Sequence, residues 1–547
     1  MLADVRQVAR RELPALDPAT AYALAIDLGT GGPKVALVAA DGHIAAHGFA
    51  TVDLLLGEGG AAEQRPAEWW DAICRSARQA MADGGVAPEN VVGVACTAQW
   101  SGTVAVGADG AAVCDALIWL DSRGASDVRA LLGGPVSAMG YDVTKLARWV
   151  RLTGGVPSLS GKDPIGHIAY LRHHRPDVYH QTAVFLEPVD YLNLRLTGRA
   201  RASFDSITAH WVTDNRDIGA VAYHPGLVKM AGLDPDRLPP LVPTGSVMGM
   251  LSADAAGDMG LLAGTPVATG TGDLHSAAVG SGAVGDFAAH LYIGTSSWIS
   301  CHVPFKRTSP TTNVASIPSG LAGRYLVANE HETAGACLNW LLDNVLYPDD
   351  GLGAPRPDAA LERLNEVAAR VPAGANGVVF TPWLNGERSP VDDHTIRAGF
   401  HNMGLATTRT DLVRAAFEGV AFNSRWLLEA VEGFCKRPFG SLAFVGGGAN
   451  SALWCQLHAD ICKRTIRQID DPVLANVRGA GLLAHVAAGR VAVGDIPSMV
   501  RSSAVFEPNP DVAPLYDEVA AEFVELYKKT KAIHRHLNQR RLGSGSH

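Results

Sequence analysis

Residues 22–40 of the 547-residue chain read YALAIDLGTGGPKVALVAA. Apolar residues fill both ends of this stretch, and a glycine-rich turn from Gly29 to Gly32 separates them. An apolar run, a glycine turn and a second apolar run predict a β-hairpin. Asp27 stands at the end of the first predicted strand, so the turn is preceded by a carboxylate.

A similar stretch recurs about half a chain later, where residues 288–300 read AAHLYIGTSSWIS. Between the two stretches lie a predicted helix at 66–81, an apolar strand at 91–98 and a second hairpin at 103–113. Alternation of strands and helices is typical of an α/β layer structure. The repeat of the hairpin predicts two structurally similar lobes, with the boundary between residues 280 and 286.

The remaining segments complete the expected domain organisation. The second half contains a helix that Thr410 and Asp411 would cap and Gly433 would end, and another helix that begins at Ser451. The first twenty residues are polar and helix-prone, and the segment after residue 490 is expected to be helical. We therefore expect four parts: an N-terminal extension at 1–20, an N-terminal lobe at 21–284, a C-terminal lobe at 285–490 and a helical tail at 491–547.

Composition excludes several classes of protein. Lys plus Arg number 46 and Asp plus Glu number 55, and the net charge of −9 excludes a broadly basic surface for nucleic acid. No run of 18 apolar residues predicts a membrane span, and the N-terminus lacks a secretory h-region. The eight cysteines contain no CxxC pair, which favours reduced thiols in a cytoplasmic protein. Whether the chain acts alone or as a homodimer stays open.

Three glycine turns, at Gly29, Gly294 and Gly446, each follow an apolar strand. Backbone N–H groups in such turns can face an anion, and Thr or Ser hydroxyls add donors. Each turn could also simply reverse the chain, but three of them, two paired across the lobes, favour a nucleotide phosphate held between the lobes. The chain has no GxxxxGK[ST] sequence, which argues against a P-loop protein.

Two aspartates at strand ends could carry chemistry. Asp27 fits a Mg²⁺ ion that bridges phosphates, or it could cap the turn. Asp273 ends a short apolar strand and could accept a hydroxyl proton in phosphoryl transfer; it could also be a helix N-cap, and both roles can coexist. In residues 381–390, TPWLNGERSP, Glu387 and Arg388 are either functional or an ordinary ion pair.

Together these motifs resemble the FGGY family of carbohydrate kinases, with the xylulokinase branch the most similar, from about Tyr22 to Gly489. The resemblance implies a two-lobed α/β fold of the actin-like ATPase (ribonuclease H-like) type, with the active site in the cleft between the lobes. It implies ATP and Mg²⁺ as cofactors and a small sugar or polyol as substrate, with Asp27 at the metal position and Asp273 as the catalytic base. The residues implied at the ATP site are Gly29, Thr30, Lys34, Gly294, Thr295, Gly446, Gly447 and Ser451.

The sugar end departs from the family pattern. The W-x-D-x-R segment of the family is present as Trp119, Asp121 and Arg123. The family's Gln-Met-His-Gly stretch is here Gln99-Trp100-Ser101-Gly102, and Leu274 follows the catalytic Asp where Asn is usual. We therefore expect Gln99, Trp100, Ser101, Asp121, Arg123 and Leu274 to bind the substrate, and D-xylulose to be a poor one.

Further departures from the family signatures lie outside these segments. His167 and Tyr170 stand where Lys and Trp are usual, and Asn402 replaces a glycine.

Several alternatives stay open at this point. The substrate could be another pentulose, a tetrose or tetritol, glycerol or a signalling polyol. From a different class, actin-like folds also serve as ATPases that act on protein clients, and a degenerate kinase could be kept for sugar sensing. The sugar-lining segment argues against a protein-client ATPase, and the presence of both Asp27 and Asp273 argues against a degenerate kinase.

Overall fold

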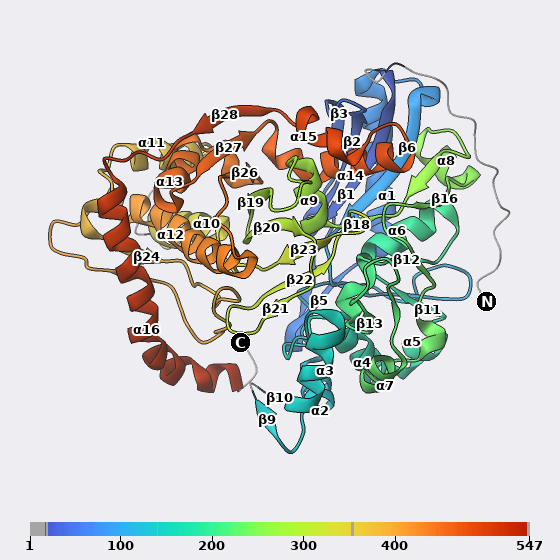
Figure 1. Cartoon of the computed structure of the whole chain (residues 1–547), viewed down its shortest axis with the longest axis horizontal. Coiled ribbons are helices and arrows are strands. Elements are labelled where there is room, and N and C mark those ends of the chain that lie inside the picture. Colours follow the sequence, from blue (N-terminus) through green and yellow to red (C-terminus); the bar gives the residue numbers. More distant parts are fainter. Residues whose placement is uncertain (1–16, 18–19, 139, 352–354, 544–547) are drawn as a thin grey trace.

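The computed structural model describes residues 17, 20–138, 140–351 and 355–543. Both predicted hairpins are present: β1 (Tyr22–Gly29) pairs antiparallel with β2 (Gly32–Ala39), and β19 (Ala289–Ile293) pairs antiparallel with β20 (Ser297–Val303). Each hairpin lies inside a separate mixed sheet, so the prediction of a two-lobed α/β fold is confirmed (Figure 1). The expected N-terminal extension lies almost entirely outside the described residues.

The first sheet has the strand order β16-β17-β6-β1-β2-β3, and β18 pairs with β6 beyond β17. Strands β1, β6 and β18 run parallel, whereas β2 and β3 continue antiparallel from β1. Helix α1 (Pro66–Gly84) packs on β2 and β3 and buries Trp69 and Ile73. The bounds of the other strands are β3 (Ile44–Phe49), β6 (Val91–Ala98), β16 (Val247–Met250), β17 (Pro266–Ala268) and β18 (Thr271–Gly272).

The second sheet has the strand order β21-β22-β23-β20-β19-β26-β27-β28. Helix α12 (Arg409–Cys435) lies against it, and α13 (Ala452–Cys462) packs on α12. The N-cap of α12 is Thr408, in a capping box with Asp411, so the predicted cap was two residues late; Ser451 caps α13 as predicted. The strands are β21 (Thr308–Ser309), β22 (Val314–Pro318), β23 (Tyr325–Ala328), β26 (Ser441–Val445), β27 (Thr465–Ile469) and β28 (Ser502–Phe506).

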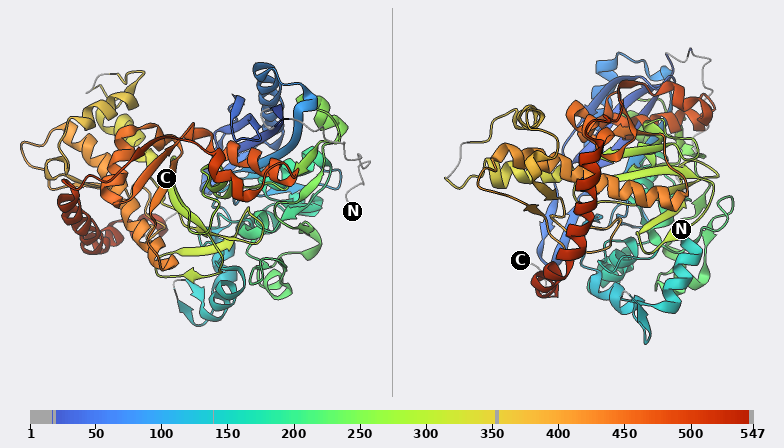
Figure 2. Two further views of the ribbon diagram at one scale, coloured as in Figure 1. Left: turned by 45° about the horizontal axis from the view of Figure 1, so that its top comes forward. Right: turned by 60° about the vertical axis from the view of Figure 1, so that its left-hand side comes forward.

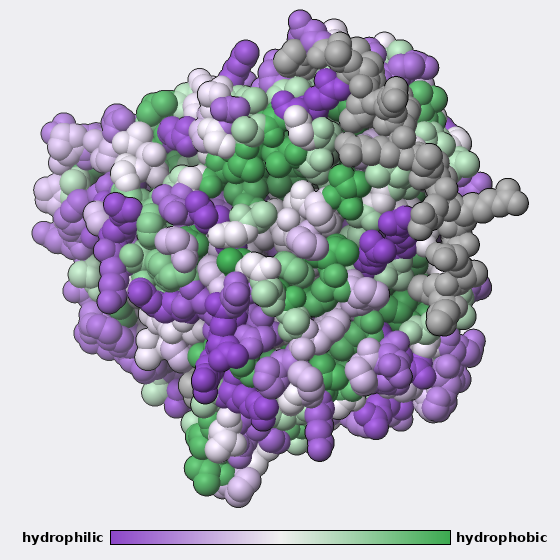
Figure 3. All heavy atoms as spheres, turned by 45° about the vertical axis from the view of Figure 1, so that its right-hand side comes forward, coloured by the Kyte–Doolittle hydropathy of each residue, from purple (hydrophilic) through white to green (hydrophobic). Residues whose placement is uncertain are grey.

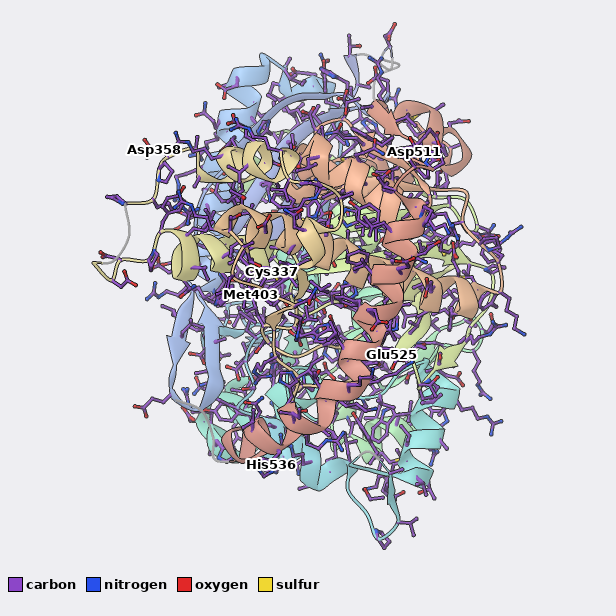
Figure 4. All side chains as sticks on the ribbon, turned by 90° about the vertical axis from the view of Figure 1, so that its left-hand side faces the viewer. Cys337, Asp358, Met403, Asp511, Glu525 and His536 are labelled. Atoms are coloured by element: carbon purple, nitrogen blue, oxygen red, sulfur yellow. The ribbon has the colours of Figure 1, made fainter. Side chains whose placement is uncertain are left out.

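The segment after residue 490 is not wholly helical, because β28 adds an antiparallel edge strand to β27. The expectation of a purely helical tail is therefore wrong at residues 502–506. Helix α16 (Ala513–Gly543) follows, and its first turns bury Tyr516 and Phe523 in the core of the second sheet. Figure 4 shows α16 descending across one face of the molecule, with Glu525 and His536 along it.

Two helices connect the sheets through backbone contact. Helix α9 (Asp273–Gly280) follows β18, and α14 (Ala475–Ala487) comes from the second half of the chain yet packs on β1, β6 and α9. A Cβ on Gly280 would lie 1.7 Å from the Ala475 carbonyl oxygen, and one on Gly479 would lie 2.0 Å from the Ser276 carbonyl oxygen. Any side chain at either position would separate the two helices.

The lobes also touch away from this crossing. Tyr325 on β23 donates to the Asn215 carbonyl at 2.8 Å, and Lys306 donates to the Val150 carbonyl at 2.9 Å. Figure 2 shows strands β21, β22 and β23 extending from the second lobe toward the first. None of the helices in the described ranges combines the length and the apolar character needed to cross a bilayer. Hydrophilic and hydrophobic residues are mixed over the face in Figure 3.

Because α9 and α14 are in backbone contact, a single added methyl group at the contact should lower the stability of the fold. Gly280→Ala should destabilise the fold by about 1–3 kcal/mol, the usual cost of overpacking, because backbone must move to admit the Cβ. Gly433→Ala is the matched control, since it lies on an exposed turn of α12 with nothing within 4 Å of its Cβ, and it should be neutral or slightly stabilising. Equal thermal midpoints for the two variants would contradict this account of the crossing.

Candidate active site

The two candidate aspartates meet at one edge of the first sheet. In the registers of the parallel strands, Asp27 on β1 lies beside Thr97 on β6, and Thr97 lies beside Thr271 on β18. Asp273 follows Thr271 by two residues and opens α9. The carboxyl ends of parallel strands meet at a common edge where ligands bind in α/β sheets. The fold therefore brings Asp27 and Asp273 to one site.

Asp27 is buried, with 4% of its surface exposed, and its closest ion partner is Lys34, with Nζ 3.6 Å from Oδ2. Burial raises the pKa of Asp27, while the Lys34 charge and hydrogen bonds from Lys34 and Asn476 lower it. Asn476, in the first turn of α14, has a buried Oδ1 without a hydrogen-bond partner. Oxygen donors of this kind suit Mg²⁺, which needs only one or two protein carboxylates beside phosphate oxygens.

Asp273 is a carboxylate with few partners. Its Oδ1 accepts a hydrogen bond from the Leu274 N–H at 2.8 Å. Burial, followed by repulsion from Asp27, raises the pKa of Asp273 to about 7. The N-cap of α9 is Gly272, and Asp273 is the first helical residue, so the interpretation of Asp273 as an N-cap is wrong. A carboxyl with a pKa near neutrality can accept a proton from a bound hydroxyl.

The glycine turns of the second sheet lie side by side. Parallel pairing of β19 with β26 sets Tyr292 opposite Val445, so the Gly446 turn adjoins the Gly294 turn. Gly446 has φ +86°, and a Cβ there would lie 2.5 Å from the Ile293 carbonyl, so this glycine serves the backbone. Gly447 is different, because its Cβ would meet nothing within 4 Å.

The first turn and Thr295 also leave room for a ligand. A Cβ on Gly31 would face open space, and one on Gly29 would lie 3.8 Å from the nearest atom, the Gly32 carbonyl oxygen. Thr295 is exposed, and the structure gives its hydroxyl no hydrogen-bond partner among the described residues, although its carbonyl accepts from Ala334 N–H at 2.9 Å. These positions can accept phosphate oxygens.

Thr30 ties the first glycine turn to the expected sugar end. Its hydroxyl donates to Gln99 Oε1 at 3.1 Å and accepts from Trp119 Nε1 at 3.0 Å. Gln64 completes the network, because it donates to the Thr30 carbonyl at 2.8 Å and accepts from Gln99 at 2.7 Å. Gln64 was not predicted from the sequence, because it precedes α1 without any recognisable motif.

Three other expected site residues have structural partners. Asp121 is fully buried, and its carboxylate accepts from Ala62 N–H at 3.0 Å and from Arg123 Nε at 2.9 Å. Arg123 also pairs with Glu63 and stacks on Tyr170, 4.5 Å from the ring centre. Asp121 and Arg123 therefore hold the wall behind the site. Ser451 Oγ accepts from Trp454 N–H at 3.0 Å as the cap of α13.

Trp100 and Ser101 border the end of the site beside Asp273. The Trp100 indole lies over Gly272, packs edge-on to His275 and donates to the Ser206 carbonyl at 3.2 Å. Ser101 has a left-handed backbone (φ +67°), and its hydroxyl donates to the Lys162 carbonyl at 3.2 Å.

Two neighbouring residues of this end were not predicted from the sequence. Burial raises the pKa of Asp163, and its carboxylate accepts a hydrogen bond from Trp211 Nε1 at 2.9 Å. Lys162 is half-buried. Leu274 belongs to a buried apolar cluster with Trp298 and Leu326 of the second sheet.

The segment at 381–390 forms part of the second lobe's side of the site. Arg388 pairs with Glu330 and Glu332, and Glu387 accepts from Asn423 Nδ2 at 2.7 Å, so the alternative of an ion pair between Glu387 and Arg388 does not hold. Burial raises the pKa of Glu387 to about 8. Glu330 adds a small upward effect on the pKa of Asp273, which places this carboxylate within electrostatic range of the catalytic candidate.

The other departures noted in the sequence have local explanations. His167 is buried, with Nδ1 3.0 Å from the Thr103 hydroxyl, and burial lowers the pKa of His167 to about 4, so the imidazole is neutral. Asn402 has φ +61°, a conformation that Gly adopts freely and Asn tolerates better than most residues.

Comparisons with known proteins agree with this geometry. Residues 22–280 match the model of the N-terminal domain of the FGGY family of carbohydrate kinases, and residues 290–488 match that of its C-terminal domain. The chain is 26% identical over 521 residues to a xylulose kinase of Staphylococcus epidermidis, covering 93% of this chain and 97% of the relative. It is 27% identical over 523 residues to an autoinducer-2 kinase of Klebsiella pneumoniae, covering 92% and 93%.

Solved structures show the same fold. The structure resembles ligand-bound xylulose kinase from Lactobacillus acidophilus with a TM-score of 0.80 and 20% identity, over 93% of this chain and 98% of that one. It resembles Plasmodium falciparum glycerol kinase with ADP with a TM-score of 0.77 and 18% identity, over 93% and 98%.

The proximity of the two carboxylates predicts a measurable titration. In ¹³C NMR of the labelled protein, the Asp273 carboxyl should titrate near pH 7, and its pKa should fall in Asp27→Asn because one repelling charge is removed. A folded pKa above the ordinary aspartate value of 3.8 means that the folded state keeps the proton to higher pH than the unfolded chain, so this group lowers stability as pH rises from about 4 to about 7. An Asp273 pKa near 4 in both proteins would contradict the geometry.

Proposed function

The chain belongs to the FGGY family of carbohydrate kinases and is an ATP-dependent kinase of a small sugar or polyol, and we propose that the transfer takes place between Asp27 and Asp273. One observation carries this proposal: two carboxylates at one sheet edge have different surroundings. Asp27 faces Lys34, whereas Asp273 lacks a cationic partner and has a pKa of about 7. The first suits a phosphate-bound cation and the second suits a base.

Asp273 acts as the general base. The substrate hydroxyl gives its proton to the Asp273 carboxylate, and its oxygen forms a bond to the γ-phosphorus of ATP while the bond from that phosphorus to the bridging oxygen of ADP breaks. A base whose pKa lies near the operating pH is ionised in a large fraction of molecules and still accepts the proton effectively. Repulsion from Asp27 supports this role because it keeps the pKa of Asp273 high.

The nucleotide lies against the three glycine turns. We propose that the phosphates lie against the Gly29 and Gly294 turns, with the Thr295 hydroxyl as a donor, and that adenosine lies over Gly447. The Gly294 N–H donates to the Ser296 carbonyl at 2.9 Å and so holds the shape of its turn. Lys34 and Thr30 support the first turn through Asp27 and Gln99. Asp27, with the Asn476 amide nearby, would hold Mg²⁺, which neutralises phosphate charge when bound.

The sugar lies at the other end of the site, beside Trp100 and Ser101. The indole offers an apolar face, and Ser101 has a shorter reach than the His usual at its position. Gln99, Asp121 and Arg123 hold the wall through their own hydrogen bonds. A site discriminates strongly against a ligand only where it can hydrogen-bond a specific hydroxyl. The substrate should therefore have fewer hydroxyls on the Trp100 side than D-xylulose, or a different configuration there.

A substrate panel tests this function. ATP turnover should be stimulated by at least one of a set that includes D-xylulose, other ketoses, tetritols, glycerol and autoinducer-2, and D-xylulose should have a lower kcat/KM than the best substrate. Asp273→Asn should lower kcat on that best substrate by roughly 10²–10⁴-fold, the usual value of general-base assistance, with little change in ATP affinity.

The outcomes separate the parts of the proposal. If D-xylulose is the best substrate, the account of the Trp100 side is wrong while the kinase assignment stands. If no sugar or polyol stimulates turnover, the proposed reaction fails. Near-normal turnover by Asp273→Asn would remove Asp273 from the mechanism.

The open space at Gly447 predicts a selective loss of nucleotide binding. Gly447→Val should weaken ATP binding at least tenfold without lowering the thermal midpoint, because its side chain would occupy the space that the nucleotide needs. Gly440→Val is the matched control: it flanks the opposite end of β26, also has open space at its Cβ, and should bind ATP normally. Calorimetric titration with ATP measures both, and normal binding by Gly447→Val would contradict the position assigned to adenosine.

A further inference from the structure

Tyr292 is a further side chain at the site. Tyr292 is the fourth residue of β19, two residues before Gly294. The residue is only partly buried, and the structure gives its hydroxyl no hydrogen-bond partner among the described residues. Tyrosine hydroxyls near a protein interior commonly take a hydrogen-bond partner, so this hydroxyl is available to one supplied by a ligand.

The Tyr292 ring is held rigidly. It stacks on the Trp298 ring of the neighbouring strand, with the ring centres 4.0 Å apart and an angle of 3° between the planes. Trp298 is fixed in turn, because its indole N–H donates to His290 Nε2 at 3.0 Å, and burial lowers the pKa of His290 to about 3, which keeps that nitrogen an acceptor. The stack therefore sets the direction of the phenol group.

That direction is toward the phosphate turn and the two carboxylates. A Cβ built on Gly294 would lie 3.0 Å from the Tyr292 hydroxyl oxygen, so the phenol covers this glycine. The ring also packs against the apolar cluster that contains Trp298 and Leu274, the residue after Asp273. Burial and the charges of Asp273 and Asp27 raise the pKa of Tyr292 above its usual range, which keeps the hydroxyl protonated and able to donate.

We propose that Tyr292 is a further catalytic residue, whose hydroxyl donates a hydrogen bond to an oxygen of the γ-phosphoryl group as it passes from ATP to the substrate. This inference rests on the proposed function. The phenol neither gains nor loses a proton: the substrate proton goes to Asp273, the new P–O bond forms, and ADP leaves. The hydrogen bond from the phenol becomes stronger as negative charge develops on the phosphoryl oxygens. It therefore stabilises the transition state more than it stabilises bound ATP.

The test removes the hydroxyl and keeps the ring. Tyr292→Phe should retain the stack on Trp298, the thermal midpoint and the affinity for ADP, while kcat falls about 10- to 100-fold and KM for ATP stays within about twofold. Tyr22→Phe is the control, since Tyr22 is the first residue of β1, at the end of the strand away from Asp27, and its hydroxyl has no hydrogen-bond partner among the described residues; its kinetics should equal those of the wild type.

A second measurement separates a catalytic role from a structural one. Binding of ADP, magnesium and aluminium fluoride, which together imitate the transferring phosphoryl group, should weaken in Tyr292→Phe by the same factor as kcat, with ADP alone unaffected. Unchanged kcat in Tyr292→Phe, or a loss that appears equally in ADP affinity, would overturn the proposal. Because the wild type is measured in parallel on the substrate panel, a wild type without activity would count against the proposed function instead.

Discussion

The backbone contact between α9 and α14 is the constraint on which the site depends. Gly280 and Gly479 let the two helices touch without intervening side chains. Helix α9 carries Asp273 at its first residue, and α14 carries Asn476 in its first turn, next to Asp27. One helix pair therefore positions the proposed base and an amide from the second half of the chain beside the carboxylate at the end of β1. The contact also joins the lobes, since α14 lies on the sheet of the first lobe.

This arrangement gives two neighbouring aspartates different properties. Lys34 and Asn476 stabilise the charge on Asp27, whereas Asp273 has one backbone N–H donor and the Asp27 charge nearby. Two carboxylates with different partners in one site can divide the proposed roles of cation ligand and base between them. The same electrostatic field keeps the Tyr292 phenol protonated.

Much of the fold follows from local sequence signals. The GTGG and GTSS turns between apolar runs predicted both central hairpins, and the strand ends predicted where Asp27 and Asp273 would lie. The helix that Ser451 caps was equally visible. These features are set by residues close together in the sequence, and apolar periodicity and turn residues indicate such local structure.

What the sequence did not show depends on distant contacts. The sequence VRGAGLL at residues 477–483 does not indicate that Gly479 contacts Ser276, some 200 residues earlier. It also does not indicate that α14 packs on the sheet of the first lobe. Glu387 and Arg388 are adjacent and oppositely charged, yet Arg388 pairs with Glu330 and Glu332, and Glu387 accepts a hydrogen bond from the Glu332 N–H. These partners lie more than 50 residues earlier in the chain. In β28 exposed and half-buried residues alternate over only five positions, which is too short to predict a strand from sequence. Its pairing with β27 is what defines it as a strand.

A crystal structure with magnesium and a non-hydrolysable ATP analogue tests the central claim most directly. The account predicts the triphosphate between the Gly29 and Gly294 turns, the metal on the Asp27 side, and the terminal phosphate facing Asp273. A nucleotide bound elsewhere, or a terminal phosphate directed away from Asp273, would contradict it.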